Sequence, residues 1–274
     1  MTRAVIFDLW DTLVDFDPVA GRAFQDQIAK RLGRDPDEFA ALWFEGRAER
    51  ESGTLRDYLL EIGAPEDLVD ELVTLRRDST LSLLEPRPGA LETLVELRAQ
   101  GRRVGLITVC SEDVPDVWNQ TPFADLFDAT VFSCSVGLRK PDPRIYRLAC
   151  EELGVEPDEA TFVGDGANDE LAGAQRVGMQ AVLVHRPDEE PAWDEVRNWQ
   201  GPRITAISQA CRFWSTSGTG SWDADAARKL RERLTSGAIW SHSALDKPGV
   251  RHWFLSSAKR AEGVTTCATR YASR

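Results

Sequence analysis

Five short apolar runs lie along the first two thirds of the chain. Each is rich in Val, Ile, Leu and Phe and shows little alternation between apolar and polar positions. Continuous apolar runs of this length are typical of parallel strands that are buried on both faces of a sheet. The pattern therefore predicts strands at about 3–8, 102–108, 129–133, 160–163 and 180–184.

Segments with helical spacing separate the later runs. They cover residues 89–100, 143–153 and 168–177, and the last of them ends at Gly178. Alternation of short buried strands with amphipathic helices is typical of α/β proteins. We therefore expect a doubly wound parallel sheet, a Rossmann-like core with helices on both faces.

A much longer segment separates the first two strands. Amphipathic helices are expected within it at 18–32, 36–51, 55–62 and 65–81. A structureless loop of this length would be unusual in a folded domain. The sequence thus predicts an all-helical unit over 17–85, inserted into a core made of 1–16 and 86–210. The chain returns to the core through Pro86-Arg87-Pro88-Gly89, a stiff linker.

The rhythm of strands and helices stops after about residue 210. Residues 211–274 hold 11 Lys and Arg against 5 Asp and Glu, although the whole chain has a net charge of -12. We expect an irregular basic tail that is either poorly ordered or foreign to the ancestral domain, with a partner-binding appendage as the alternative. The remaining body is strongly acidic and would repel a phosphate backbone, which argues against nucleic acid as a partner.

The ends of the chain and its cysteines restrict the setting. The N-terminus runs into the first predicted strand without a charged leader or an apolar signal segment, which favours a cytoplasmic protein without a membrane partner. The 5 cysteines show no C-x-x-C pair, so reduced, packed thiols are expected. Nothing in the pattern indicates the oligomeric state.

Chemically useful side chains follow four of the predicted strands. Asp8 ends the first, Thr108 ends the second, and Lys140 follows the third; Asp165 and Asp169 follow the fourth. In a doubly wound sheet these strand ends meet at one edge, where such proteins bind ligands. Each residue alone is an ordinary loop or strand-end residue, but their order and spacing together favour a site.

The residue types have complementary chemistry. Crowded carboxylates need a cation to stay ionised, and a set of oxygen ligands selects a hard ion such as Mg²⁺. Asp165 is accordingly a candidate metal ligand, with Asp169 beside it. An ionised Asp8 can attack phosphorus as a nucleophile, while Lys140 and the Thr108 hydroxyl bind phosphoryl oxygens.

This set resembles the haloacid dehalogenase superfamily of hydrolases, most of whose members are phosphatases. The resemblance covers about residues 3–210. It rests on Phe7-Asp8-Leu9 with Thr12-Leu13, on Thr108, on Lys140-Pro141, and on Gly164-Asp165-x-x-x-Asp169 followed by Gly173-Ala174. It implies a magnesium-dependent hydrolase that acts on a small phosphorylated substrate through an aspartyl-phosphate. It also implies that the helical insertion is a cap over the site, and that Asp8 and the Trp10 carbonyl join Asp165 and Asp169 as metal ligands.

Trp10 departs from the family pattern. The phosphatases of the family carry a second Asp at this position, which protonates the leaving group and then activates water. An indole has no titratable proton near neutral pH. Three hypotheses follow: a phosphatase that uses Asp11, Glu112 or Asp113 instead or favours good leaving groups, a haloacid dehalogenase, whose halide leaves without a proton, or a binding protein without turnover. A receiver domain lacks the helical insertion, and no G-x-G-x-x-G follows the first strand to suggest a dinucleotide.

Overall fold

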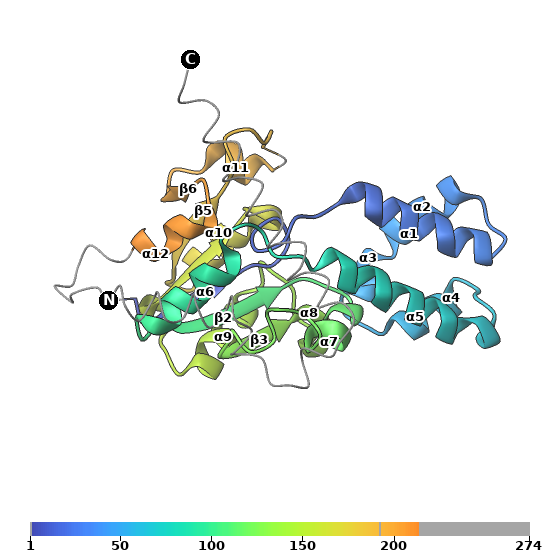
Figure 1. Cartoon of the computed structure of the whole chain (residues 1–274), viewed down its shortest axis with the longest axis horizontal. Coiled ribbons are helices and arrows are strands. Elements are labelled where there is room, and N and C mark those ends of the chain that lie inside the picture. The colour runs from blue at the N-terminus through green and yellow to red at the C-terminus, as the bar shows by residue number, and fades with distance from the viewer. Residues whose placement is uncertain (1, 192, 214–274) are drawn as a thin grey trace, which may run out of the picture.

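A parallel sheet forms the centre of the computed structural model, which describes residues 2–191 and 193–213 (Figure 1). The strand order is β3-β2-β1-β4-β5-β6, and every neighbouring pair is parallel. The strands are β1 (Ala4–Phe7), β2 (Arg103–Thr108), β3 (Ala129–Phe132), β4 (Ala160–Gly164), β5 (Gln180–Val184) and β6 (Arg203–Ile204). The direction of the order reverses beside β1, so the carboxyl ends of β1 and β4 open the crevice in which such sheets bind ligands.

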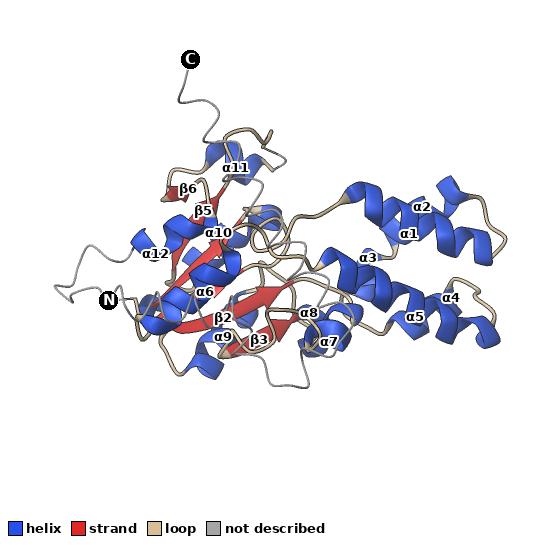
Figure 2. Cartoon of the chain, viewed as in Figure 1, coloured by secondary structure: helices blue, strands red, loops and turns tan. Residues whose placement is uncertain are grey.

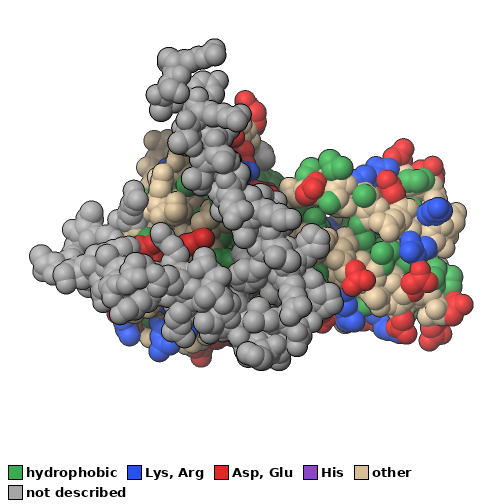
Figure 3. Space-filling view, viewed as in Figure 1, with side chains coloured by type: hydrophobic (Ala, Val, Ile, Leu, Met, Phe, Trp, Pro, Cys, Tyr) green, Lys and Arg blue, Asp and Glu red, His purple; other side chains and the backbone are tan. Residues whose placement is uncertain are grey.

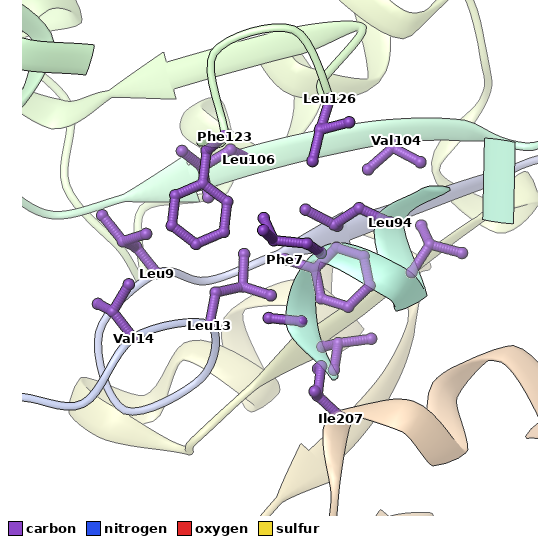
Figure 4. Close-up of a cluster of buried hydrophobic side chains, with 14 of the residues drawn as sticks. Phe7, Leu9, Leu13, Val14, Leu94, Val104, Leu106, Phe123, Leu126 and Ile207 are labelled. Atoms are coloured by element: carbon purple, nitrogen blue, oxygen red, sulfur yellow. The ribbon is translucent and has the colours of Figure 1, made fainter. Parts of the chain in front are cut away.

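Helices cover both faces of this sheet. They are α6 (Ala90–Ala99), α7 (Asp113–Trp118), α8 (Ser133–Val136), α9 (Pro143–Leu153), α10 (Glu170–Arg176), α11 (Asp194–Asn198) and α12 (Ala210–Phe213). Alternate residues of β1 enter different cores, because successive strand side chains point to opposite faces. Phe7 packs with Leu94 of α6, whereas Ile6 packs with Tyr146 of α9. Figure 4 shows the first of these clusters, in which Phe7 lies among Leu94, Leu106 and Ile207.

Five further helices form a separate layer beside the sheet, and we call residues 18–83 the cap (Figure 2). They are α1 (Pro18–Arg31), α2 (Pro36–Glu45), α3 (Arg47–Arg50), α4 (Leu55–Glu61) and α5 (Glu66–Leu83). Asp17, Asp35 and Thr54 begin three of them by accepting hydrogen bonds from first-turn amides. The cap has its own apolar cluster, built around Phe24, Trp43 and Leu59.

The chain enters and leaves the cap at neighbouring points. Val14 and Pro86 form an antiparallel bridge between the two connecting segments. The Arg87 guanidinium lies between them, with Nε 2.6 Å from Asp15 Oδ1 and a second hydrogen bond to the Asp11 carbonyl. On the far side, α5 packs along α7 of the core. None of the described helices is both long and apolar enough to cross a membrane.

Most predicted elements are present, and the differences have local causes. The helix expected over 36–51 is divided at Gly46, where an added Cβ would lie 2.1 Å from the Tyr58 ring. The predicted helix over 168–177 begins only at Glu170, after a 3₁₀ turn, and β6 adds a strand at the edge. The predicted tail starts too early: residues 211–213 belong to α12, and Cys211 is buried with its thiol 3.5 Å from the Thr93 carbonyl of α6. The rest of that tail, 214–274, lies outside the described residues.

Candidate active site

Asp8 lies directly after β1 and is almost completely buried. Its backbone N–H donates to the Val163 carbonyl at 2.9 Å, which fixes it at the crevice between β1 and β4. The loop then turns sharply, with Leu13 and Val14 donating to the Leu9 carbonyl and Asp11 in a left-handed conformation at φ 54°. A non-glycine residue in that region is strained, and such strain is concentrated at functional sites.

Lys140 is the cation of the site. Its buried Nζ donates to Asp8 Oδ1 and, at 2.5 Å, to Glu170 Oε2. Its other contact is with the Phe162 ring, whose centroid lies 5.3 Å from Nζ. The two carboxylates hold the pKa of Lys140 above its ordinary value despite burial. Lys140 is therefore a fixed positive charge beside the candidate nucleophile.

The structure places Glu170, not Asp169, in the acidic cluster. Asp169 is exposed, and both it and Asn168 have left-handed backbone, at φ 55° and 54°. That turn brings the side chain of Glu170, the first residue of α10, into the interior. Gly164 makes room for it, since a Cβ there would lie 2.0 Å from Glu170 Oε1. The same oxygen accepts the Gly166 N–H at 3.1 Å, so the two glycines are the sequence signal that could have identified Glu170.

Three carboxyl groups converge at this point. Ligand oxygens of Asp8, Asp165 and Glu170 lie within 4.8 Å of one another. The pKa of each is raised to about 7, chiefly by burial and in addition by neighbouring negative charge: Glu170 acts on Asp8, Asp8 on Asp165, and Asp165 on Glu170. Lys140 opposes the shift in all three. One ammonium does not neutralise three carboxylates, so the cluster has the charge and the oxygen donors that suit a divalent cation.

The donor set fits Mg²⁺ best at Asp8 and Asp165. Both oxygens of Glu170 already accept hydrogen bonds, from Lys140 and from the Gly166 N–H. Asp165 Oδ1 accepts the Ala167 N–H at 3.1 Å, which orients its carboxylate. Asp8 and Asp165 would hold the ion, while Glu170 holds the lysine. A contribution from the Trp10 carbonyl stays a prediction.

Thr108 ends β2 and is fully buried. Its Oγ1 has no hydrogen-bond partner among the described residues. Buried hydroxyls are nearly always paired, so an orphan at a strand end needs an explanation. A phosphoryl oxygen of a bound substrate would supply the missing partner, as the sequence predicts.

A cavity of about 420 Å³ lies between the core and the cap. Asp8, Lys140 and Asp165 line its floor, and three arginines of the cap, Arg47, Arg50 and Arg76, line its wall. Trp10 is half-buried at the same cavity and meets the Phe16 ring edge to face, at 6.3 Å between centroids. The large indole lines the cavity beside the candidate nucleophile and carries no group that titrates near neutral pH.

Two of the alternative proton donors are already used to join the cap to the core. Glu112 Oε1 accepts the Leu55 N–H at 2.7 Å. Asp113 is buried, accepts from Ser111 and Thr80, and lies 3.0 Å from Arg76 Nε. Asp11 alone of the three expected substitutes lines the cavity, and burial raises its pKa. Its Oδ1 accepts the Phe16 N–H at 3.0 Å.

A doubly wound parallel sheet with a buried aspartate and a buried lysine at its switch point, covered by a helical cap, is the architecture of a capped hydrolase. The chain belongs to the haloacid dehalogenase-like hydrolases, whose family model matches residues 2–178.

Relatives of this chain include both phosphatases and haloacid dehalogenases. The glyceraldehyde 3-phosphate phosphatase of Methanopyrus kandleri is 32% identical over 212 residues, which cover 71% of this chain and 90% of that protein. The (S)-2-haloacid dehalogenase 4A of Burkholderia cepacia is 27% identical over 208 residues, covering 70% and 87%. Among solved structures, the 2-haloacid dehalogenase of Pseudomonas syringae matches with a TM-score of 0.59 and 28% identity, covering 77% of this chain and 97% of that one.

Proposed function

We propose that this hydrolase is a magnesium-dependent phosphatase that acts on a small phosphorylated metabolite in the cytoplasm, with Asp8 as its nucleophile. The observation that carries the proposal is the acidic cluster around Lys140. Halide displacement from carbon needs one ionised carboxylate and no metal ion. A crevice with three carboxyl groups and one lysine favours phosphoryl transfer, in which a divalent cation is useful. The acidic body of the chain argues for a small substrate over nucleic acid.

Each residue has a defined part in the reaction. An ionised Asp8 oxygen attacks the phosphorus, the bond from phosphorus to the leaving oxygen breaks, and the alcohol departs with a proton. Lys140 neutralises charge on the phosphoryl oxygens, and the Thr108 hydroxyl donates to one of them. Water then cleaves the aspartyl-phosphate, which releases phosphate and restores Asp8. Bound Mg²⁺ would supply further charge neutralisation to the same oxygens.

The weak point is proton transfer. Trp10 cannot protonate the leaving alcohol, so we infer that Asp11 or solvent does so, or that substrates with good leaving groups are favoured. Loss of a general acid and base typically costs roughly 10² to 10⁴-fold, which slows nucleophilic chemistry without abolishing it.

Phosphate release from an aryl phosphate tests the proposal. We expect release that depends on added Mg²⁺, that chelation with EDTA removes, and that Asp8→Asn abolishes because an amide is not a nucleophile of this kind. The matched control is Asp70→Asn, a change of the same type at a carboxylate that is 84% exposed on the cap. Full activity of Asp8→Asn would refute the assignment of Asp8 as the nucleophile.

The same protein should be given a 2-chloro acid without metal. Trp10 is the observation that favours this second activity, since a departing chloride needs no proton. Chloride release without metal, in place of phosphate release, would replace the phosphatase with a dehalogenase. If neither phosphate nor chloride is released, the result would favour a binding protein that has this fold without turnover.

A further inference from the structure

Three arginines of the cap line the cavity, and they differ in how their charges are balanced. Arg47 Nε lies 2.5 Å from Glu51 Oε1, and Arg76 Nε lies 3.0 Å from Asp113 Oδ2. Arg50 has no ion-pair partner among the described residues. Its Nη1 is buried and donates to no hydrogen-bond acceptor in that part of the chain. One guanidinium on the cavity wall is therefore without a counter-ion.

Arg50 is held in place by aromatic rings. Its Cζ lies 3.9 Å from the centroid of the Trp43 ring and 4.8 Å from that of Tyr58. The Tyr58 hydroxyl donates to the Leu42 carbonyl at 2.9 Å, so the ring itself is fixed. Gly46 lets the ring approach, because a Cβ there would collide with it. The guanidinium is thus positioned before any ligand arrives, which lowers the entropic cost of binding.

Burial of this charge is costly. Arg50 is 6% exposed, and desolvation lowers its pKa to about 10, helped by the neighbouring Arg76. Glu51 and Tyr58 oppose the shift only in part. Glu51 is the adjacent acid, but its carboxylate is shared between Arg47 and Arg139, 2.6 Å away. Buried charges are normally paired, so a positive group left unpaired beside a cavity points to an anion that enters it.

We propose that Arg50 binds a second anionic group of the substrate, so that the preferred substrate is a phosphomonoester that also carries a carboxylate or a second phosphate. This inference rests on the proposed phosphatase function. The reacting phosphate would lie at Asp8 and Lys140, and the other anion would lie at Arg50, which lines the same cavity. At about 420 Å³ the cavity is near the lower end of ligand pockets, about 300–1,000 Å³, which suits a short carbon chain between the two anions.

Matched substrates test the proposal on the wild-type protein. Glycerol 3-phosphate and 3-phosphoglycerate differ in a hydroxymethyl group against a carboxylate, and glycerol 1,3-bisphosphate adds a second phosphate. We expect kcat/KM to be roughly 10- to 100-fold higher for one of the two substrates that carry a second anionic group than for glycerol 3-phosphate, the range of a charge-assisted hydrogen bond at a buried site. The comparison also decides between carboxylate and phosphate. Equal rates on all three would overturn the Arg50 proposal, whereas no hydrolysis of any of them or of an aryl phosphate would refute the phosphatase itself.

Variants assign the preference to Arg50. Arg50→Met keeps the apolar stem over Trp43 and removes the charge. It should raise KM more for the substrates that carry a second anionic group than for glycerol 3-phosphate, so that the preference is lost. Arg50→Lys keeps a positive charge and should retain part of the preference. This variant also tests the proposal if Arg50→Met does not fold. Arg56→Met is the control, since Arg56 is exposed and pairs with Asp70. Basic and acidic side chains are mixed on the face of the cap that Figure 3 shows. A uniform loss across all substrates in Arg50→Met and Arg50→Lys would show a structural role and overturn the proposal.

Discussion

Among individual residues, Lys140 decides the charge of the site. It is buried, contacts Asp8 and Glu170, and is the cation that each of the three clustered carboxyl groups shares. Glu170 holds the ammonium from behind, through a space that exists only because residue 164 is glycine. Lys140 therefore orients Asp8 and favours its ionised form, against burial and the charge of Glu170, which raise its pKa.

The first prediction at this scale concerns Trp10. Trp10→Asp restores a titratable group two positions after the nucleophile and should speed hydrolysis of alkyl phosphates by roughly 10-fold or more, within the range of general acid catalysis. Aryl phosphates should gain less, because an aryl oxide leaves without much help. Steady-state rates on both substrates check this, with Trp10→Asn as the control of equal size. An equal gain in both variants would attribute the effect to space and not to a proton.

The raised pKa values give a second prediction. Asp8 and Asp165 have a pKa of about 7 in the folded, metal-free protein and about 4 in the unfolded chain. Their contribution to the free energy of unfolding is therefore fully present below about pH 4 and is lost as the pH rises through about 7. Mg²⁺ competes with the bound proton, so it should raise the melting temperature more at about pH 8 than at about pH 6. Thermal unfolding with and without MgCl2 measures this, and Asp165→Asn should reduce the shift. The same Mg²⁺ shift in that variant would exclude Asp165 as a ligand.

At the scale of elements, the bend between α2 and α3 shapes the cavity wall. The chain turns at Gly46, which ends one helix and begins the next, and the turn places Arg50 against Trp43 and Tyr58. Any side chain at position 46 would collide with the Tyr58 ring. Glycine at this turn is therefore a requirement of the packing and not only of the chain path.

Gly46→Ala tests that statement. The added methyl would lie 2.1 Å from the Tyr58 ring, and overpacking of this kind costs about 1–3 kcal/mol of unfolding free energy. Gly21→Ala is the matched control in α1, where a Cβ meets nothing within 4 Å; it should be neutral or stabilise by up to about 1 kcal/mol. Urea unfolding gives both values. Equal stability of the two variants would mean that Tyr58 moves aside at no cost.

The strand ends explain how much of this site the sequence could predict. Four of the predicted site residues lie at or after the ends of buried strands: Asp8, Thr108, Lys140 and Asp165. The pattern of apolar runs was therefore enough to predict that they lie at one edge of the sheet. Glu170 was missed because Asn168 and Asp169 have left-handed backbone, and this conformation turns Glu170 and not Asp169 toward the interior. A left-handed conformation is hard to predict from the sequence at residues other than glycine. The helix α7 was missed because Pro115 and two aspartates in six residues hide its apolar face. The side of α7 that is buried packs against residues distant in the sequence, chiefly those of α5, so the local sequence alone does not reveal it.

At the scale of the whole molecule, three groups of contacts fasten the cap to the core. Along α7, Glu112 receives the Leu55 N–H, Asp113 pairs with Arg76, and Arg77 pairs with Asp116. The connecting segments are joined by Arg87, and Glu51 of the cap pairs with Arg139 of the core. Movement of the cap must preserve or break these contacts, so they contribute to the cost of opening the cavity.

Asp113→Asn should loosen the α7 attachment. Removal of the carboxylate leaves the largely buried Arg76 guanidinium unpaired and should cost about 2–3 kcal/mol of unfolding free energy, with a higher KM. Asp116→Asn, on the same helix, removes an ion pair with an exposed Arg77 and should cost less than about 1 kcal/mol. Urea unfolding and steady-state kinetics on the two variants check the contrast. Similar costs would show that burial of the Asp113 pair contributes nothing.

The bridge between Val14 and Pro86 has a consequence for how such proteins diversify. Because the chain departs and returns at adjacent points, the cap residues that line the cavity, such as Trp43, Arg47 and Arg50, are encoded in one uninterrupted stretch of the gene. The reactive groups lie outside that stretch. Recombination at its two borders would exchange one substrate preference for another in a single event, while the machinery that breaks the bond is inherited unchanged.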